Sequence, residues 1–142
     1  AMDESDVENI MKYPHTMIAS DGRISEPGDG HPHPRAYGTF PRVLGKYVRE
    51  KQVLSLSEAI YKMTYLPAKA FGLKDRGLIN EGMKADITIF DANSVIDKST
   101  FESPHQYPEG IKYVIINGQL AVDDFEFKKI KAGEVLRKLI KI

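Results

Sequence analysis

The sequence predicts an α/β protein whose sheet is incomplete within these 142 residues. Three observations support this prediction. Apolar residues recur at helical spacing through much of residues 1–72, strand-like segments occupy residues 73–142, and the first part holds a single candidate strand. A lone strand leaves its backbone N–H and C=O groups without partners. We therefore expect residues 1–72 to be a piece of a larger sheet or barrel, followed by a second unit of residues 73–142.

The composition excludes several classes of protein. Twenty basic and twenty acidic residues leave no formal net charge, whereas a general nucleic-acid binder needs a basic excess. The absence of cysteine excludes disulfides and thiolate metal ligands within this chain. No apolar run approaches the ~20 residues that a bilayer span needs, and no secretory signal opens the chain. We expect a cytoplasmic protein without nucleic-acid or membrane partners.

The first elements are a helix, a strand and a loop. Residues 4–13 carry apolar residues at i, i+3 and i+4 with acids at the front, which predicts a short helix. Residues 16–20 are apolar with β-branched members and predict a buried strand. Glycine and proline recur through residues 21–39, so we expect a long loop there, of the kind that often binds or catalyses.

Two helices should follow this loop. From Phe40 an apolar stripe at helical spacing runs to about residue 54, with proline tolerated in its first turn. The pair Ser55 and Glu58 matches a capping box, so the next helix should begin at Ser55. It should be interrupted near Pro67 and end at Gly72.

The remaining residues have strand character. Residues 85–91 alternate in polarity, and residues 112–124 contain Asn-Gly at 117–118, the strongest short-range hairpin signal. Residues 133–142 are consistent with a weak amphipathic helix or a final strand.

Asp21 is the first candidate for chemistry. It follows the candidate strand and precedes a glycine, and parallel α/β folds place catalytic groups at such strand ends. In a metal-dependent hydrolase, an acid there can take a proton from water and pass it to the leaving group. Ser-Asp-Gly is also an ordinary turn sequence, so spacing alone leaves both interpretations open.

The loop after Asp21 offers histidines and arginines. His31 and His33 would share one face of a strand, which suits zinc, but the neighbouring prolines favour pocket-lining loop residues instead. His105 is isolated and is expected to be structural or on the surface. Arg35 and Arg42 could each hold a carboxylate through a guanidinium fork, or form an ion pair on the surface or between domains.

Four segments together resemble the C-terminal part of N-acyl-D-amino-acid deacylases (D-aminoacylases), members of the amidohydrolase superfamily. They are TMIASDG, GHPHPRAYGTFPRVLGKYVRE, LSLSEAIYKMTYLPAKAFGLKDRGLINEGMKADITIFD and GIKYVIINGQLAVDD. The resemblance covers residues 2–137. The HPRAYGTFPRVLG stretch is specific to the deacylase branch, whereas GMKADITIFD and VIINGQ are general to amidohydrolases.

The resemblance implies a fold and a reaction. Residues 1–72 would hold the last strand and closing helices of a metal-dependent (β/α)8 barrel, with its catalytic loop. Residues 73–142 would supply C-terminal strands of a small β-sandwich domain. The implied enzyme is a zinc-dependent hydrolase that cleaves N-acyl-D-amino acids to a carboxylate and a free D-amino acid.

The resemblance also implies roles for single residues. Asp21 matches the catalytic aspartate beside the metal, and Arg35 matches the arginine that binds the substrate α-carboxylate. His33 and Tyr37 flank Arg35 as candidate substrate-binding residues, although Tyr37 could equally be a packing residue. The main zinc ligands would lie upstream of this chain, so we expect these residues alone to be inactive.

Two other functions remain open. One is a different amidohydrolase, such as a dihydroorotase-like cyclic amidase, and the other is a non-catalytic binding or oligomerisation module. We expect the chain to pair with a missing N-terminal part or to self-associate. The expected reason is exposure of the apolar stripe at Val43, Leu44, Tyr47 and Val48, which half a barrel would leave uncovered.

Overall fold

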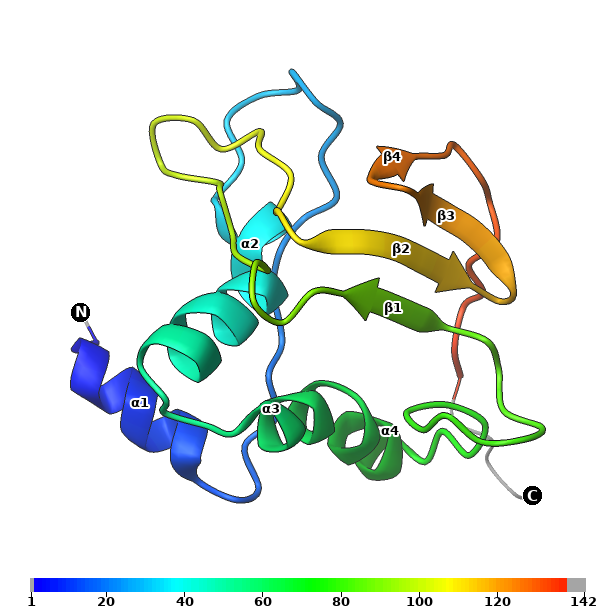
Figure 1. Ribbon diagram of the computed structural model, residues 1–142, viewed down its shortest axis with the longest axis horizontal. Coiled ribbons are helices and arrows are strands. Elements are labelled where there is room, and N and C mark those ends of the chain that lie inside the picture. The colour runs from blue at the N-terminus through cyan, green and yellow to red at the C-terminus, as the bar shows by residue number, and fades with distance from the viewer. Residues whose placement is uncertain (1, 138–142) are drawn as a thin grey trace.

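The computed structural model describes residues 2–137 as a group of helices followed by an antiparallel sheet (Figure 1). The helical elements are α1 (Glu4–Lys12), α2 (Arg35–Arg42), η1 (Val43–Glu50), α3 (Leu56–Met63) and α4 (Tyr65–Phe71). The strands are β1 (Ile87–Phe90), β2 (Ile111–Ile116), β3 (Gln119–Asp123) and β4 (Glu126–Phe127). The predicted change from helices to strands after Gly72 is therefore confirmed for the described residues.

The sheet has the simple order β1-β2-β3-β4, with every neighbouring pair antiparallel. The predicted hairpin joins β2 to β3, and Asn117 and Gly118 both have positive φ, at 49° and 81°. Two central residues with positive φ make the type I′ turn that Asn-Gly favours. The two-residue strand β4 was not predicted from the sequence, because its residues carry no alternation long enough to detect.

Residues 16–20 form no strand among the described residues, and none of them is buried, which corrects the prediction of a buried strand. No parallel neighbour lies beside this segment within residues 2–137, so it makes no ladder. Its backbone contacts go to α3 instead. The N–H of Ile18 donates to the carbonyl of Lys62 (3.2 Å), and the buried Lys62 amine donates to the carbonyls of Tyr13 (2.5 Å) and Thr16 (3.2 Å).

The helix predicted from Phe40 begins earlier, at Arg35, so the loop ends at Pro34 and not at residue 39. Pro34 has φ −50°, which is already helical, and the Thr39 hydroxyl donates back to the Arg35 carbonyl (3.0 Å). The helix α2 continues directly into η1, a π-helix that ends at Glu50 rather than near residue 54. The glycine-rich sequence concealed this start because glycine disfavours helices when no tertiary contact compensates.

The start of α3 and the stop at Gly72 agree with their predictions, but the break between them does not lie at Pro67. The helix α3 ends at its C-cap Thr64 (φ −125°), and Pro67 lies inside the first turn of α4, where a proline is tolerated. Asp3 forms a capping box with Asp6 at the start of α1, and Ser55 forms one with Glu58 at the start of α3. The predicted stop at Gly72 is confirmed, since its φ of 72° closes α4 in the left-handed conformation. Residues 133–137 have no regular structure, and the rest of the segment 133–142 lies outside the described residues.

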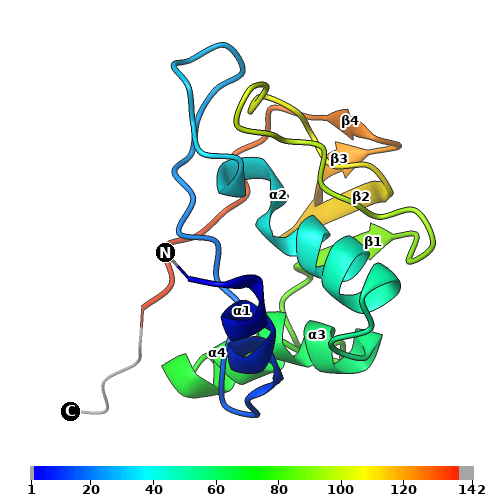
Figure 2. The ribbon, with the colours of Figure 1, turned by 90° about the vertical axis from the view of Figure 1, so that its left-hand side faces the viewer.

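One core joins the helices to the segment after β1. Its buried residues come from α1, η1, the η1–α3 turn, α3 and that segment: Met11, Val43, Leu44, Tyr47, Leu54, Ala59 and Val95. The expectation that the η1 stripe is exposed is therefore wrong, because α1, α3 and Val95 cover it. Figures 1 and 2 both show the helices grouped beside the four strands. None of the helices within residues 2–137 has the length and apolar character to cross a membrane.

Candidate active site

Asp21 and Arg35 meet at the start of α2. Asp21 Oδ2 lies 2.8 Å from Arg35 Nη2, and the two side chains are 85% and 46% exposed. The sequence placed these residues in one long loop, whereas the structure brings them into an ion pair. An exposed carboxylate beside a guanidinium is chemically available to a ligand from solvent, because neither group is enclosed by this chain.

The backbone around Asp21 makes this contact possible. Asp21 has φ 45°, a left-handed conformation that aspartate adopts more readily than most residues. The Gly22 N–H donates to the Ser20 hydroxyl (3.2 Å), and a Cβ at Gly22 would lie 2.8 Å from the Cα of Ala36. Only glycine fits against the first turn of α2 here, so residues 20–22 are packed directly onto that helix.

His33 organises the N-terminus of α2. Its Nδ1 accepts a hydrogen bond from the N–H of Arg35 (3.0 Å), which requires that nitrogen to be unprotonated. The imidazole ring meets Phe101 edge to face, with centroids 4.9 Å apart. His33 therefore fixes the backbone of the residue that carries the exposed guanidinium.

Tyr37 lies on another side of α2. Its hydroxyl is 3.0 Å from His105 Nδ1, and His105 Nε2 donates to the carbonyl of Gly30 (3.1 Å). Because Nε2 is the donor, Nδ1 of a neutral His105 accepts from the Tyr37 hydroxyl. Burial, and to a smaller extent Tyr107, raises the pKa of Tyr37. His105 is thus structural, one of the two alternatives predicted for it.

A second histidine, His31, also connects the loop after Asp21 to residues 98–109. His31 Nε2 donates to the Phe101 carbonyl (2.6 Å), so the loop after Asp21 is held against residues 98–109 at several points. These pairs are about 70 residues apart in the chain, and no sequence pattern could have indicated them. Within residues 2–137, no three His, Cys, Asp or Glu side chains are grouped so that they could hold a metal ion.

A cleft of about 420 Å³ opens beside α2. Its lining residues are His33, Pro34, Arg35, Gly38, Thr39, Arg42, Asp97, Ser99, Thr100, Phe101 and Glu102. Two of the predicted site residues, His33 and Arg35, line this cleft. Asp21 and Tyr37 are not part of the lining, although Asp21 pairs with Arg35 at its edge.

Arg42 ends the row of cleft residues on α2. Its Nη1 lies 2.6 Å from Asp97 Oδ2, and the Asp97 side chain is only 8% exposed. Burial acts to lower the pKa of Arg42, but the hydrogen bond and charge of Asp97, with help from Tyr47, outweigh burial and raise it. Of the two arginines, Arg42 is therefore held by an internal acid, while Arg35 pairs with an exposed one.

Comparison with known proteins identifies relatives along nearly the whole chain. The N-acyl-D-glutamate deacylase of Alcaligenes xylosoxydans xylosoxydans is 48% identical over 97% of this chain and 28% of its own length. The crystal structure of the Bordetella bronchiseptica N-acyl-D-glutamate deacylase, complexed with zinc and a phosphonate inhibitor, matches with a TM-score of 0.79 at 43% identity. That match covers 85% of this chain and 25% of the other.

A D-aminoacylase structure with a binuclear metal centre matches more closely in shape. Its TM-score is 0.85 at 45% identity, over 93% of this chain and 27% of the other. The chain spans about a quarter of the length of the relatives it matches. The sequence pattern of the amidohydrolase family extends over residues 5–122, from α1 into β3. The chain therefore belongs to the amidohydrolase family.

Proposed function

We propose that this chain is the C-terminal portion of a zinc-dependent amidohydrolase that hydrolyses N-acyl-D-amino acids. The products would be a carboxylate and a free D-amino acid. The observation that carries the proposal is the 2.8 Å pair of Asp21 and Arg35, both exposed, at the start of α2. Hydrolysis of such a substrate needs a proton carrier at the amide and a cation for the α-carboxylate, and this pair supplies both.

Asp21 would act as the proton carrier. Water adds its oxygen to the acyl carbon, the C–N bond breaks, and the nitrogen leaves with an added proton. The Asp21 carboxylate accepts the proton from water and delivers it to that nitrogen. Its 85% exposed side chain is free to face a substrate held at the edge of the cleft.

Arg35 would bind the substrate α-carboxylate. A guanidinium binds a carboxylate through two parallel hydrogen bonds, which fixes orientation as well as position. The substrate carboxylate would replace Asp21 as the partner of Arg35 and so release the aspartate for proton transfer. His33 would hold the Arg35 backbone and line the cleft, and Tyr37 would support the same turn through His105.

Zinc would supply polarisation of the amide and activation of water. The described residues do not by themselves fit such an ion, because they contain no cluster of three possible ligands. Asp21 is the one residue of this chain that we propose lies beside the metal. The remaining ligands would come from a longer protein, consistent with the quarter of the relatives' length that this chain spans. These residues alone should therefore be inactive.

The proposed architecture divides the chain near Gly72. Residues 1–72 would close a (β/α)8 barrel with residues 16–20 as its last strand, and residues 73–142 would add strands to a small β-domain. The absence of strand neighbours beside residues 16–20 within the described residues supports this, because a barrel would supply those neighbours. The partner of this chain would be the N-terminal part of the same protein, with self-association as the alternative.

The decisive experiment assays the longer protein with zinc on N-acetyl-D-amino acids. Asp21→Asn should reduce kcat about 10²–10⁴-fold, the usual effect of losing a general acid–base group, while the zinc content stays nearly unchanged. Arg35→Met should mainly raise KM. The matched control is Asp29→Asn, an exposed acid of the same loop, which should leave both constants unchanged. Full activity of the Asp21→Asn enzyme would refute the proton-transfer role.

The same assay separates the two alternatives. Turnover of dihydroorotate without turnover of N-acetyl-D-amino acids would favour the cyclic amidase. A longer protein that binds zinc and hydrolyses neither substrate would favour a non-catalytic module.

A further inference from the structure

Arg35, Gly38, Thr39 and Arg42 line one cleft at helical spacings of three, four and seven residues. Arg35 stands at one end of this face and Arg42 at the other. The two guanidinium groups differ in their partners. Asp21, the partner of Arg35, is 85% exposed, whereas Asp97, the partner of Arg42, is 8% exposed.

Asp97 lies on a rigid segment. Val95, two residues before Asp97, is completely buried. Ile96 pairs with Glu109 through two backbone hydrogen bonds of 3.3 and 3.0 Å. Gly110, which follows Glu109, approaches so closely that a Cβ would lie 2.5 Å from the backbone nitrogen of Val95. Residues 95–97 are thus held against the start of β2 and cannot easily follow a shift of α2.

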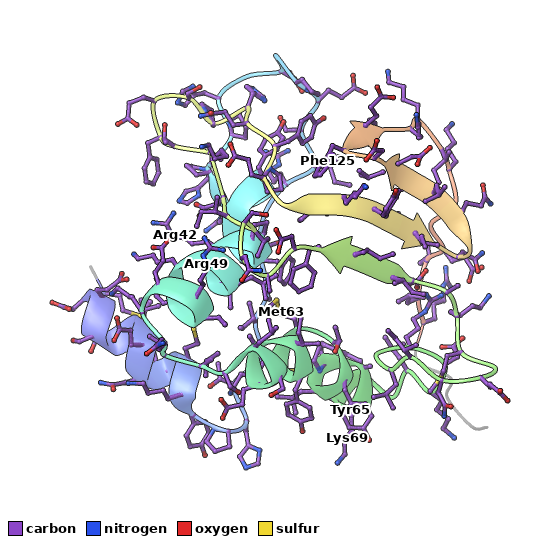
Figure 3. All side chains as sticks on the ribbon, viewed as in Figure 1. Arg42, Arg49, Met63, Tyr65, Lys69 and Phe125 are labelled. Carbon is purple, nitrogen blue, oxygen red and sulfur yellow. The ribbon has the colours of Figure 1, made fainter. Side chains whose placement is uncertain are left out.

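The helix α2–η1 touches this segment with its own backbone. A Cβ at Gly38 would lie 2.9 Å from Asp97 Cβ. Farther along, Arg49 Nη1 donates to the carbonyl of Val95 (2.6 Å). Figure 3 shows Arg42 and Arg49 along this helix, on the stretch that faces residues 95–97. Both contacts with Asp97, at Gly38 and at Arg42, lie closer to Arg35 along the helix than the contact of Arg49 with Val95.

We propose that Asp97 is a positioning residue for substrate binding, acting through Arg42 to hold α2 so that Arg35 meets the substrate α-carboxylate. This inference rests on the proposed function. A second effect of the same contact is that Asp97 neutralises Arg42. Only Arg35 is then left to compete for an anion in the cleft.

The test uses the longer zinc enzyme and its Asp97→Asn and Arg42→Met variants. Each should raise KM for an N-acetyl-D-amino acid about 10–100-fold, as expected for displacement of a substrate-positioning group, with a much smaller change in kcat. The double variant should have about the same KM as either single variant, because each single substitution already removes the contact between Asp97 and Arg42. Asp97→Glu and Arg42→Lys keep the charges and should recover part of the affinity.

A substrate without the α-carboxylate separates positioning from general destabilisation. An N-acetyl alkylamine cannot use Arg35, so its kcat/KM should change little in the Asp97→Asn enzyme. A merely structural role for Asp97 would lower turnover of both substrates equally, and that result would overturn the proposal. The control is Lys98→Met, which removes a pair between two exposed side chains, Lys98 and Glu109 (3.1 Å), and should leave KM unchanged.

Amide hydrogen exchange supplies a readout independent of activity. Asp97→Asn should increase exchange in residues 36–42, whereas Lys98→Met should not. Wild-type enzyme without deacylase activity would refute the proposed function, and the exchange result would still decide whether Asp97 holds α2. Unchanged exchange in Asp97→Asn would overturn the positioning role even in an active enzyme.

Discussion

Gly45→Ala tests the contact between η1 and the segment after β1. A Cβ at Gly45 would clash with Ile96 Cδ1 and would lie 2.7 Å from the carbonyl oxygen of Val95, well below the ordinary contact distances of 3.4–4 Å. The Ile96 methyl can rotate away, but the Val95 carbonyl is backbone. That carbonyl also accepts the hydrogen bond of Arg49 (2.6 Å), so any shift of the helix weakens this bond too.

The expected change in the free energy of unfolding combines one stabilising effect with two destabilising ones. Alanine is favoured over glycine in a helix by about 1 kcal/mol. Overpacking costs about 1–3 kcal/mol, and a weakened hydrogen bond to a charged donor costs up to about 1.5–3 kcal/mol. Gly45→Ala should therefore lower the free energy of unfolding by about 1.5–5 kcal/mol despite its better helix propensity.

Urea denaturation measures this change directly, as a lower midpoint with an unchanged slope. Gly133→Ala is the matched control, because nothing lies within 4 Å of a Cβ there and the expected change is within about 0.5 kcal/mol. Adding Ile96→Ala to Gly45→Ala should restore only part of the loss, since the clash with the Val95 carbonyl remains. A Gly45→Ala protein as stable as wild type would refute this packing.

Two further predictions concern α3 and α1. Lys62→Met removes both hydrogen bonds from the buried amine to the turn after α1 and should lower the free energy of unfolding by about 1.5–3 kcal/mol, whereas the exposed Lys69→Met should not. Hydrogen bonds from Lys46 and Lys51 lower the pKa of Glu4 from 4.5 to about 2. The ionised Glu4 therefore stabilises the folded state above pH 4.5, and this stabilisation is lost as the pH falls towards 2. The melting temperature should therefore change less between pH 4.5 and pH 2 in the Glu4→Gln variant than in the wild type.

Local signals made parts of this fold predictable. The capping box of Ser55 and Glu58, the stop at Gly72 and the turn at Asn117–Gly118 each depend on residues close together in the chain. Such features are decided by backbone geometry and short-range hydrogen bonds, so the sequence contains the whole explanation. The residues of these three features lie where they were expected.

Long-range contacts explain what could not be predicted. The start of α2 at Arg35 depends on Pro34, on the His33 ring and on the close approach of Gly38 to Asp97. The last contact joins residues far apart in the sequence, and it makes a glycine favourable inside a helix. The buried η1 stripe was mispredicted for a similar reason, because α1 and Val95 cover it only after the chain folds.

The change from helices to strands near Gly72 does not divide the core. Val95 comes from the second half of the chain yet packs among residues of α1, η1 and α3, and Asp97 pairs with Arg42 of α2. His105 and Phe101 hold the loop that follows Asp21. Residues 95–110 therefore support the loop and the helix that hold Asp21 and Arg35, although they carry no candidate catalytic group of their own. A mutation there should change substrate affinity without touching the proposed chemistry, and Asp97 is the residue at which this separation is most direct.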